Sequence, residues 1–256
     1  MAAEQTKHLD LLGCLECGAA ALTFDSGKPD RIRCGGCGQA YDLVNGIFKF
    51  IDTVDDYTEN YDQICKDDLE AEKTPSEIKA ILAALIRERA VGVTCDLGCG
   101  DGYTISRVEA PRKMVVDIAR AYLERLPDSI TRIWGNVERT PILAQSIDTL
   151  VCTDVIEHVL DADALAQEID RILKPTGRAL LAFPFEQDLS VYELPEYKRK
   201  YGKYKYVHLR SIDDRLVSSW FPGFEVVYER LITDGMRFME FKPYPVKFIE
   251  LRRKLG

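Results

Sequence analysis

The chain has 256 residues, of which 46% are hydrophobic and 30% are charged, an ordinary globular composition. This length suits one medium domain and a small one, and no apolar run approaches the roughly 20 residues that cross a bilayer. Acidic side chains outnumber basic ones by 42 to 34, which disfavours nonspecific attraction to nucleic acid or anionic membranes. The N-terminus lacks the basic and apolar stretches of a secretory signal, so we expect a cytoplasmic protein without a membrane span.

The acidic excess is concentrated in the first third of the sequence. Residues 1–90 contain 10 basic and 17 acidic side chains, whereas residues 91–256 contain 24 and 25. An anion-binding surface is therefore expected in the C-terminal part.

Two C-x-x-C pairs near the N-terminus predict a metal site. Their spacing of 16 residues is typical of a four-thiolate zinc centre, in which each pair occupies one tight turn. Two disulfides in an exported protein are the alternative, but a reducing cytosol disfavours them. We expect the other four cysteines, Cys65, Cys95, Cys99 and Cys152, to pack as small apolar residues. The predicted zinc ligands are Cys14, Cys17, Cys34 and Cys37.

Residues 1–51 are predicted to form a small zinc module of two short strand pairs. So few residues bury little apolar surface, so the metal would supply much of the folding free energy and its role would be structural. The module resembles the zinc ribbon of the small proteins that bind and activate methyltransferases, including Cys37-Gly38-x-x-Tyr41 and Asn45-Gly46-Ile47. The resemblance implies a ribbon fused to its client, and leaves open whether the ribbon also binds substrate.

Residues 52–90 are expected to be a linker or lid followed by a helix. Residues 52–75 are acidic around Tyr57 and Tyr61 and show no clear periodicity. Thr74 as N-cap, Pro75 and Glu77 form a capping box. Apolar residues then recur with helical spacing until Gly92.

Strand and helix patterns alternate through residues 91–256, which predicts an α/β fold with a mainly parallel, doubly wound sheet. An antiparallel pair is expected at the sheet edge, followed by a charged terminal helix over residues 242–254. The expected strands are 93–96, 113–117, 130–134, 147–153, 178–183, 224–230 and 236–241, and the expected helices are 103–109, 119–126, 164–173 and 213–220.

The sequence Asp96-Leu97-Gly98-Cys99-Gly100-Asp101-Gly102 follows the first of these strands. Its glycines allow a sharp turn and a close approach of the backbone to a ligand. Asp117 ends the second strand 21 residues after Asp96, where nucleotide-binding α/β folds place an acid that binds ribose hydroxyls. Together these features predict a nucleoside site.

This loop differs from the G-x-G-x-x-G of dinucleotide oxidoreductases and is similar to that of class I S-adenosylmethionine methyltransferases, from about Val91 to Val227. The resemblance implies a Rossmann-like, seven-stranded sheet with S-adenosylmethionine as cofactor. The family usually has aspartate where this chain has Asn136. The implied cofactor-binding residues are Asp96, Gly98, Gly100 and Gly102 for the methionine part, Asp117 for the ribose, and Asn136, Val137 and Glu138 for the adenine.

A block at residues 151–159 resembles the D-V-I/L-E-H-V segment of small-molecule methyltransferases, among them ubiquinone-biosynthesis enzymes. The resemblance implies that Thr153, at the strand end, faces the sulfonium. His158 is a candidate catalytic residue. Alternatively, Glu157 and His158 cap the next helix or hold each other.

A further block, His208-Leu209-Arg210-Ser211, precedes a Gly223-Phe224-Glu225-Val226 strand and resembles the same family. The resemblance implies that His208 lies near the acceptor pocket. An imidazole with a pKa of about 6.5 suits proton removal from a hydroxyl or amine. A supporting role behind the pocket is equally compatible with the sequence.

The predicted lid around residues 184–212 is rich in basic and aromatic residues. Residues 198–210 contain six Lys or Arg, three Tyr and no acid. Such a segment could follow a nucleic-acid strand, grip an anionic small molecule, or form a solvated, tyrosine-packed loop.

These features favour an enzyme that methylates oxygen or nitrogen of a small or carrier-linked metabolite. The sulfonium methyl is already activated, so alignment is the main task and we expect no catalytic metal. The alternative is an rRNA or tRNA base methyltransferase whose ribbon docks RNA, although the five basic and ten acidic residues through Glu59 disfavour it. A scaffold that only binds S-adenosylmethionine is a third interpretation. The oligomeric state is not indicated.

Overall fold

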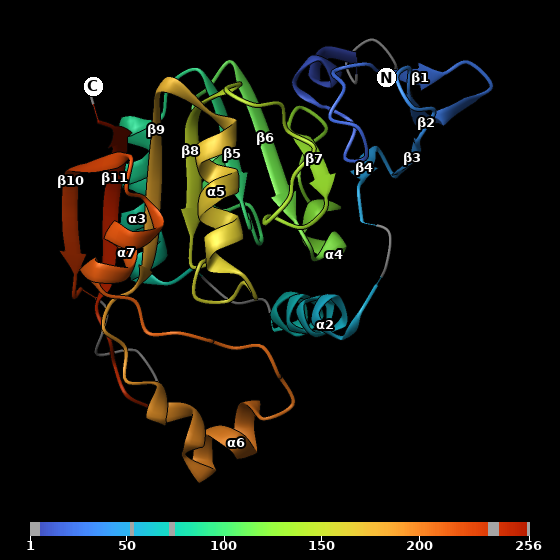
Figure 1. Cartoon of the computed structure of the whole chain (residues 1–256). Helices are drawn as coiled ribbons and strands as arrows, with labels where there is room; N and C mark the ends of the chain where they lie inside the picture. Colours follow the sequence, from blue (N-terminus) through green and yellow to red (C-terminus); the bar gives the residue numbers. More distant parts are fainter. Residues whose placement is uncertain (1–5, 52–53, 72–74, 235–240, 255–256) are drawn as a thin grey trace.

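The computed structural model describes residues 6–51, 54–71, 75–234 and 241–254. Its central feature is an 11-stranded sheet in the order β1-β2-β3-β4-β7-β6-β5-β8-β9-β11-β10 (Figure 1). From β7 to β9 the strands are parallel, and β11 inserts antiparallel to β9. This arrangement confirms the predicted Rossmann-like, doubly wound α/β fold. Its seven strands are β5 (Val93–Leu97), β6 (Arg112–Asp117), β7 (Thr131–Trp134), β8 (Ile147–Thr153), β9 (Leu173–Pro184), β10 (Phe224–Ile232) and β11 (Val246–Arg253).

The cysteine-rich N-terminal part continues the same sheet. Its last strand pairs in parallel with β7, so that Phe48 lies opposite Ile133 and Lys49 opposite Trp134. The two expected domains are therefore joined through backbone hydrogen bonds along one edge. This part consists of η1 (Thr6–Leu11), β1 (Leu22–Asp25), β2 (Lys28–Cys34), β3 (Ala40–Val44) and β4 (Ile47–Lys49).

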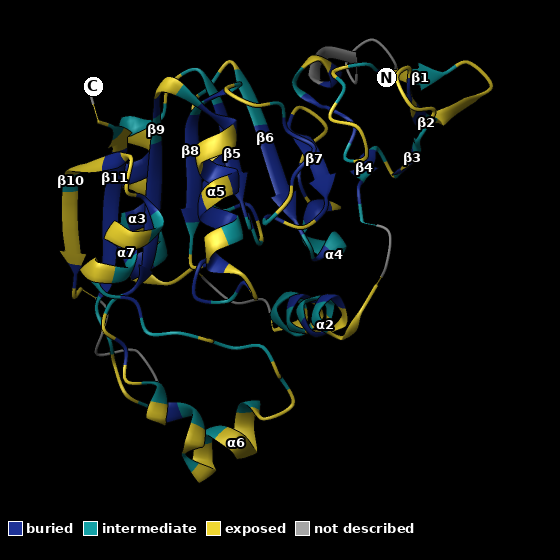
Figure 2. Ribbon diagram, viewed as in Figure 1, coloured by how far each residue is buried: buried dark blue, intermediate teal, exposed yellow. Residues whose placement is uncertain are grey.

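Helices cover both faces of the sheet. Helix α3 (Glu77–Arg89) lies on one face, and α5 (Ala162–Ile172) and α7 (Asp214–Trp220) lie on the other (Figure 1). The central strands are buried on both sides, whereas β10 is largely exposed (Figure 2). Cys65, Cys95, Cys99 and Cys152 are buried as expected. Among the described residues, no helix is long and apolar enough to cross a membrane.

The acidic segment after the ribbon is helical, which corrects the expectation of an irregular linker. Helix α2 (Asp56–Glu70) begins after Asp55, whose carboxylate accepts a hydrogen bond from the backbone N–H of Thr58 at 2.9 Å. Helix α3 is capped by Ser76, which accepts from Lys79 N at 3.1 Å. The predicted cap, Thr74, lies outside the described residues. Helix α2 lies below the carboxyl ends of the central strands (Figure 1).

The predicted C-terminal helix over residues 242–254 is wrong, because β11 occupies most of that range and lies between β9 and β10. Its charges are paired within the sheet: Lys247 lies 3.0 Å from Glu229, and Glu250 lies 3.7 Å from Arg178. The predicted strand at 236–241 lies outside the described residues except for Phe241. The expected helix at 103–109 is only the short turn η2 (Ile105–Arg107).

Candidate functional site

A cavity of about 230 Å³ is lined by residues at and just after the ends of β5, β6 and β8 and by residues of α2. We call it the strand-end pocket. Its walls combine turn backbone, strand-end side chains and one face of α2. The lining residues are Tyr57, Tyr61, Ile64, Gly98, Gly100, Asp117, Ile118, Ala119, Tyr122, Asn136, Val137, Asp154, Val155, His158 and Val159.

Asp117 is the anchored carboxylate of this pocket. It is only 7% exposed, and its two oxygens accept hydrogen bonds from Ala119 N at 2.8 Å and Gly100 N at 2.9 Å. Burial raises the pKa of Asp117, and those two N–H groups partly offset the effect. Each carboxylate oxygen can accept a second hydrogen bond, so Asp117 can also bind hydroxyl groups in the pocket.

The glycine loop bends as the sequence predicts, but its residues have different roles. Gly98 has φ of +72°, and a Cβ there would lie 2.4 Å from the side chain of Val155. Gly100 lines the pocket, and a Cβ there would meet no atom within 4 Å. Gly102 is not in the lining and packs against Leu126, where a Cβ would lie 2.1 Å away.

Other predicted cofactor-binding residues divide between the lining and its support. Asn136 and Val137 line the pocket, whereas Thr153 and Glu138 do not. Asp96 lies outside the lining and is 2% exposed. Burial, together with the nearby charge of Asp117, raises the pKa of Asp96 to about 7.

Helix α2 contributes one side of the pocket that the sequence motifs do not predict. Tyr57, Tyr61 and Ile64 follow i, i+4, i+7 spacing and all line the cavity. This spacing was a detectable helical signal among the acidic residues.

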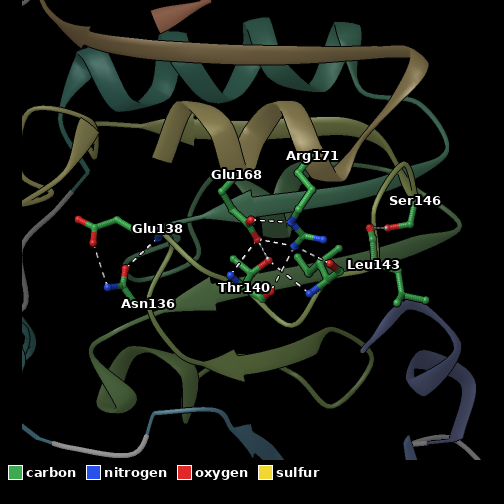
Figure 3. A network of polar contacts seen from close by, with 8 residues as sticks. Asn136, Glu138, Thr140, Leu143, Ser146, Glu168 and Arg171 are labelled. Carbon is green, nitrogen blue, oxygen red and sulfur yellow. Dashed lines mark hydrogen bonds and ion pairs between the residues drawn. The ribbon is translucent and has the colours of Figure 1, made fainter. Parts of the chain in front are cut away.

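A polar network fixes the loop that follows Asn136 (Figure 3). The buried Glu168 carboxylate accepts from the backbone N–H of Thr140 at 2.8 Å and pairs with Arg171 at 2.6 Å. Arg171 also donates to the carbonyl of Ile142 at 2.7 Å. The same loop meets the N-terminal part, because Leu143 N donates to Leu11 O at 2.9 Å. The network therefore connects the pocket wall to the ribbon.

A second cavity of about 220 Å³ adjoins the first. We call it the tyrosine pocket. His158 lines both cavities and marks their junction. The lining residues of the tyrosine pocket are His158, Gln187, Val191, Tyr192, Tyr197, Tyr201, Val207, His208, Phe241, Lys242 and Tyr244.

The two predicted catalytic histidines meet at this junction, with ring centroids 4.7 Å apart. His158 Nδ1 lies 3.3 Å from the carbonyl of Val207, and His208 Nδ1 contacts Gln187 Oε1. Burial lowers the pKa of His158 to about 4 and that of His208 to about 3. Burial therefore makes both rings weaker bases than a free imidazole, whose pKa is about 6.5.

Glu157 does not have the capping role that the sequence allowed. Asp161 caps α5 by accepting from Ala164 N at 2.9 Å. Glu157 is fully buried, and its Oε1 lies 4.0 Å from His158 Nε2, too far for a hydrogen bond. Burial, followed by the charge of Asp154, raises the pKa of Glu157.

The basic lid segment (residues 184–212) contains the turn η3 (Leu189–Glu193) and the helix α6 (Pro195–Tyr201), and beyond α6 it is attached to α2. Lys203 pairs with Asp67 at 2.6 Å, and Lys205 pairs with Asp56 at 2.5 Å. Tyr61 also donates to the carbonyl of Tyr206 at 2.9 Å. These two lysines therefore neutralise acids of α2 and do not point unpaired charge at a ligand.

The four cysteines of the ribbon converge with sulfurs within 4.8 Å of one another. The Cys14–Cys37 and Cys17–Cys34 sulfur distances are both 3.6 Å. Disulfide sulfurs would be about 2 Å apart, whereas zinc–thiolate bonds of about 2.3 Å in a tetrahedron place sulfurs roughly 3.8 Å apart. Burial tends to raise the pKa of Cys14, but hydrogen bonds from Tyr41 and backbone N–H groups lower it to about 6. The four residues fit a zinc ion.

The strand order and the strand-end pocket define the fold as that of class I methyltransferases. Residues 95–181 match the family described as "Methyltransferase domain", so the chain contains a domain of this kind.

Curated relatives agree with this assignment. One is a malonyl-[acyl-carrier protein] O-methyltransferase from a Methylovorus species, 27% identical over 61% of this chain and 63% of the relative. Another is a probable S-adenosylmethionine-dependent methyltransferase from Mycolicibacterium smegmatis, 30% identical over 35% of this chain and 37% of the relative. The chain spans between 44% and 63% of the length of the first three relatives.

Solved structures share the fold. A geranyl diphosphate C-methyltransferase from Streptomyces coelicolor aligns with a TM-score of 0.59 and 12% identity, covering 80% of this chain and all of that chain. A chain from the complex between the Haloferax volcanii Trm112 methyltransferase activator and a methyltransferase aligns with a TM-score of 0.57 and 15% identity, with the same coverages.

Proposed function

We propose that the protein transfers a methyl group from S-adenosylmethionine to oxygen or nitrogen of a small or carrier-linked metabolite. The junction of the two pockets at His158 is the observation that carries this proposal. Methyl transfer is an in-line displacement, which requires donor and acceptor to be held next to each other. The strand-end pocket would take the donor and the tyrosine pocket the acceptor.

The donor would be held mainly by groups at the strand ends. Asp117 would accept the ribose hydroxyls, and Asn136 and Val137 would contact the adenine. Gly98 and Gly100 would let the turn backbone approach the methionine part. Asp96 lies outside the lining and would not contact the donor directly.

The acceptor side favours a small molecule over a nucleic acid. Lys203 and Lys205 are already paired with α2, and Lys242 contacts Ser190 at 2.6 Å and Asp188. A nucleic acid would have to break these pairs before it could use the same charges. The aromatic walls suit a compact acceptor or the end of a carrier arm.

Labelled methyl transfer to cell extracts tests the proposal. We expect labelling that persists after ribonuclease treatment and that is lost with Asp117→Ala. Label confined to ribonuclease-sensitive material would show that the acceptor is RNA. Saturable donor binding with no transfer to any extract fraction would favour a scaffold that only binds the donor.

We also propose that the ribbon holds one structural zinc ion through Cys14, Cys17, Cys34 and Cys37. A zinc–thiolate centre requires reduced cysteines, which is consistent with a cytoplasmic location. Cys14→Ser or Cys37→Ser should remove the zinc and unfold the ribbon, whereas Cys65→Ser should keep it. Metal analysis of the intact protein measures the zinc content per chain. A zinc-free protein with both C-x-x-C pairs oxidised would overturn the assignment.

A further inference from the structure

Three potential metal ligands meet at the junction of the two pockets. Glu157, His158 and His208 each offer one ligand atom, and these atoms all lie within 4.8 Å of one another. Glu157 and His158 belong to the turn after β8, whereas His208 comes from the lid segment. The cluster is separate from the ribbon cysteines.

Each imidazole is oriented by one hydrogen bond at its Nδ1 atom. With Nδ1–H donating to the carbonyl of Val207, His158 keeps the lone pair of Nε2 free. With Nδ1–H donating to Gln187 Oε1, His208 likewise keeps the lone pair of its Nε2 free. Metal-binding histidines almost always have such a partner on the other nitrogen, because it fixes the tautomer and the ring orientation.

Glu157 supplies an independent observation. Its side chain is fully buried, and neither carboxylate oxygen has a hydrogen-bond partner among the described residues. Buried carboxylates normally have such partners or bind a cation. The backbone around Glu157 is fixed, since its carbonyl accepts from Leu209 N at 2.8 Å and that of Ile156 accepts from Arg210 at 2.6 Å.

We propose that Glu157, His158 and His208 bind a divalent transition-metal ion at the junction, an inference that rests on the proposed methyl transfer for its chemical role. Two imidazoles and one carboxylate suit Zn²⁺, Mn²⁺, Co²⁺ or Fe²⁺, and three protein ligands leave open positions for an acceptor oxygen. From the sequence we expect no catalytic metal, and the buried Glu157 carboxylate argues against that expectation.

Such an ion would activate a hydroxyl acceptor. Coordination lowers the pKa of the hydroxyl, which releases its proton to solvent. The resulting oxygen anion forms a bond to the methyl carbon, while the carbon–sulfur bond breaks and its electron pair stays on sulfur. The cationic donor becomes a neutral thioether, and the acceptor becomes a methyl ether. The weakly basic histidines need not take the proton.

Manganese titration of the full-length protein, with zinc limited to the one ion per chain that the ribbon takes, tests the site directly. Mn²⁺ prefers nitrogen and oxygen ligands over four thiolates, so it reports this cluster and not the ribbon. Electron paramagnetic resonance measures the free Mn²⁺ that remains. We expect one saturable Mn²⁺ site per chain.

Matched variants distinguish the site from adventitious binding. Glu157→Gln and His208→Ala should each weaken Mn²⁺ binding by about 100-fold or more, and Gln187→Leu by about 10–100-fold, as for partners of metal ligands elsewhere. Glu196→Gln makes the same chemical change as Glu157→Gln on the exposed surface of α6 and should bind Mn²⁺ normally. Circular dichroism checks that each variant is folded.

The outcomes separate this proposal from the proposed function. Binding that is absent in the wild type, or that is equal in wild type and Glu157→Gln, overturns the metal site even if methyl transfer is detected. Saturable Mn²⁺ binding that Glu157→Gln abolishes supports the metal site even if no acceptor is methylated, in which case only the proposed function fails.

Discussion

The strand-end pocket and the tyrosine pocket share His158 but are built from different kinds of structure. The first is formed largely by turn backbone at the ends of buried parallel strands, with Asp117 tied to two N–H groups. The second is formed by aromatic side chains of the lid segment, which exposed ion pairs attach to α2. A common donor needs the fixed geometry of the first, and a particular acceptor can be accommodated by changes in the second.

The difference also predicts where the molecule opens. Opening the strand-end turns would break buried sheet contacts, whereas detaching the lid segment from α2 would break exposed ion pairs and a few partly buried hydrogen bonds. We therefore expect exchange of the acceptor to occur by movement of the lid segment against α2. The following predictions test this contrast.

The largest expected effect is a loss of stability on substitution in the glycine turn. Gly98→Ala forces a side chain into φ of +72° and against Val155 at 2.4 Å, which should cost about 2–4 kcal/mol of stability. Gly100→Ala is the matched control, because its Cβ enters open space and only the φ of +51° is strained. It should lose donor affinity more than stability. Urea unfolding measures the stability, and calorimetry measures the donor affinity. Equal destabilisation by the two substitutions would contradict the roles assigned to these glycines.

Asp117→Ala should weaken S-adenosylmethionine binding by about 1.5–3 kcal/mol, the usual range for hydrogen bonds to a charged group. Calorimetry measures the affinity. Asp101→Ala, an exposed acid of the same turn that pairs with Lys79 at 2.7 Å, should leave it nearly unchanged. Equal S-adenosylmethionine affinity of Asp117→Ala and wild type would show that Asp117 does not bind the ribose.

Acid should destabilise the junction of the pockets. The folded pKa values of His158 and His208, about 4 and about 3, lie below the unfolded value of about 6.5. The unfolded chain therefore binds more protons in this range, so stability falls as the pH drops from about 6.5 toward 3. His158→Gln should flatten this dependence by about 2 kcal/mol between pH 7 and pH 4.5. Urea midpoints at both pH values measure it, and parallel pH profiles would contradict it.

The smallest effect is expected in the lid segment. Lys203→Ala combined with Lys205→Ala should raise KM for the acceptor and leave donor affinity intact, because the lid loses its pairs with α2. Added salt should raise the wild-type KM in the same way. Lys198→Ala is the control, since Lys198 pairs with Glu193 within the lid segment itself. A steep salt dependence of binding that the double variant flattens would instead indicate RNA phosphate contacts.

The strand-end pocket was predictable from sequence because local rules determine it. A strand, a glycine turn and an acid 21 residues later suffice to place Asp117 and Gly98 at one sheet edge. The α2 contribution was not predicted, because the eight acidic residues of 52–70 obscure the helical spacing of Tyr57 and Tyr61.

Tertiary pairing explains the other errors. The charges of β11 suggested a helix face, but Lys247 and Glu250 are buried in ion pairs between neighbouring strands. A strand that is buried on both faces lacks the alternating pattern that identifies most strands. The approach of His208 to His158 joins residues 50 positions apart, which local patterns do not specify.

The parallel pairing of β4 with β7 also affects the order in which the chain can fold during synthesis. Phe48 leaves the ribosome long before its partner Ile133, so β4 must wait with an unpaired edge, the kind of edge that recruits other chains. A ribbon already closed around zinc would present only this three-residue strand, which is too short to template aggregation. Zinc supply during translation should then influence the soluble yield of the whole chain.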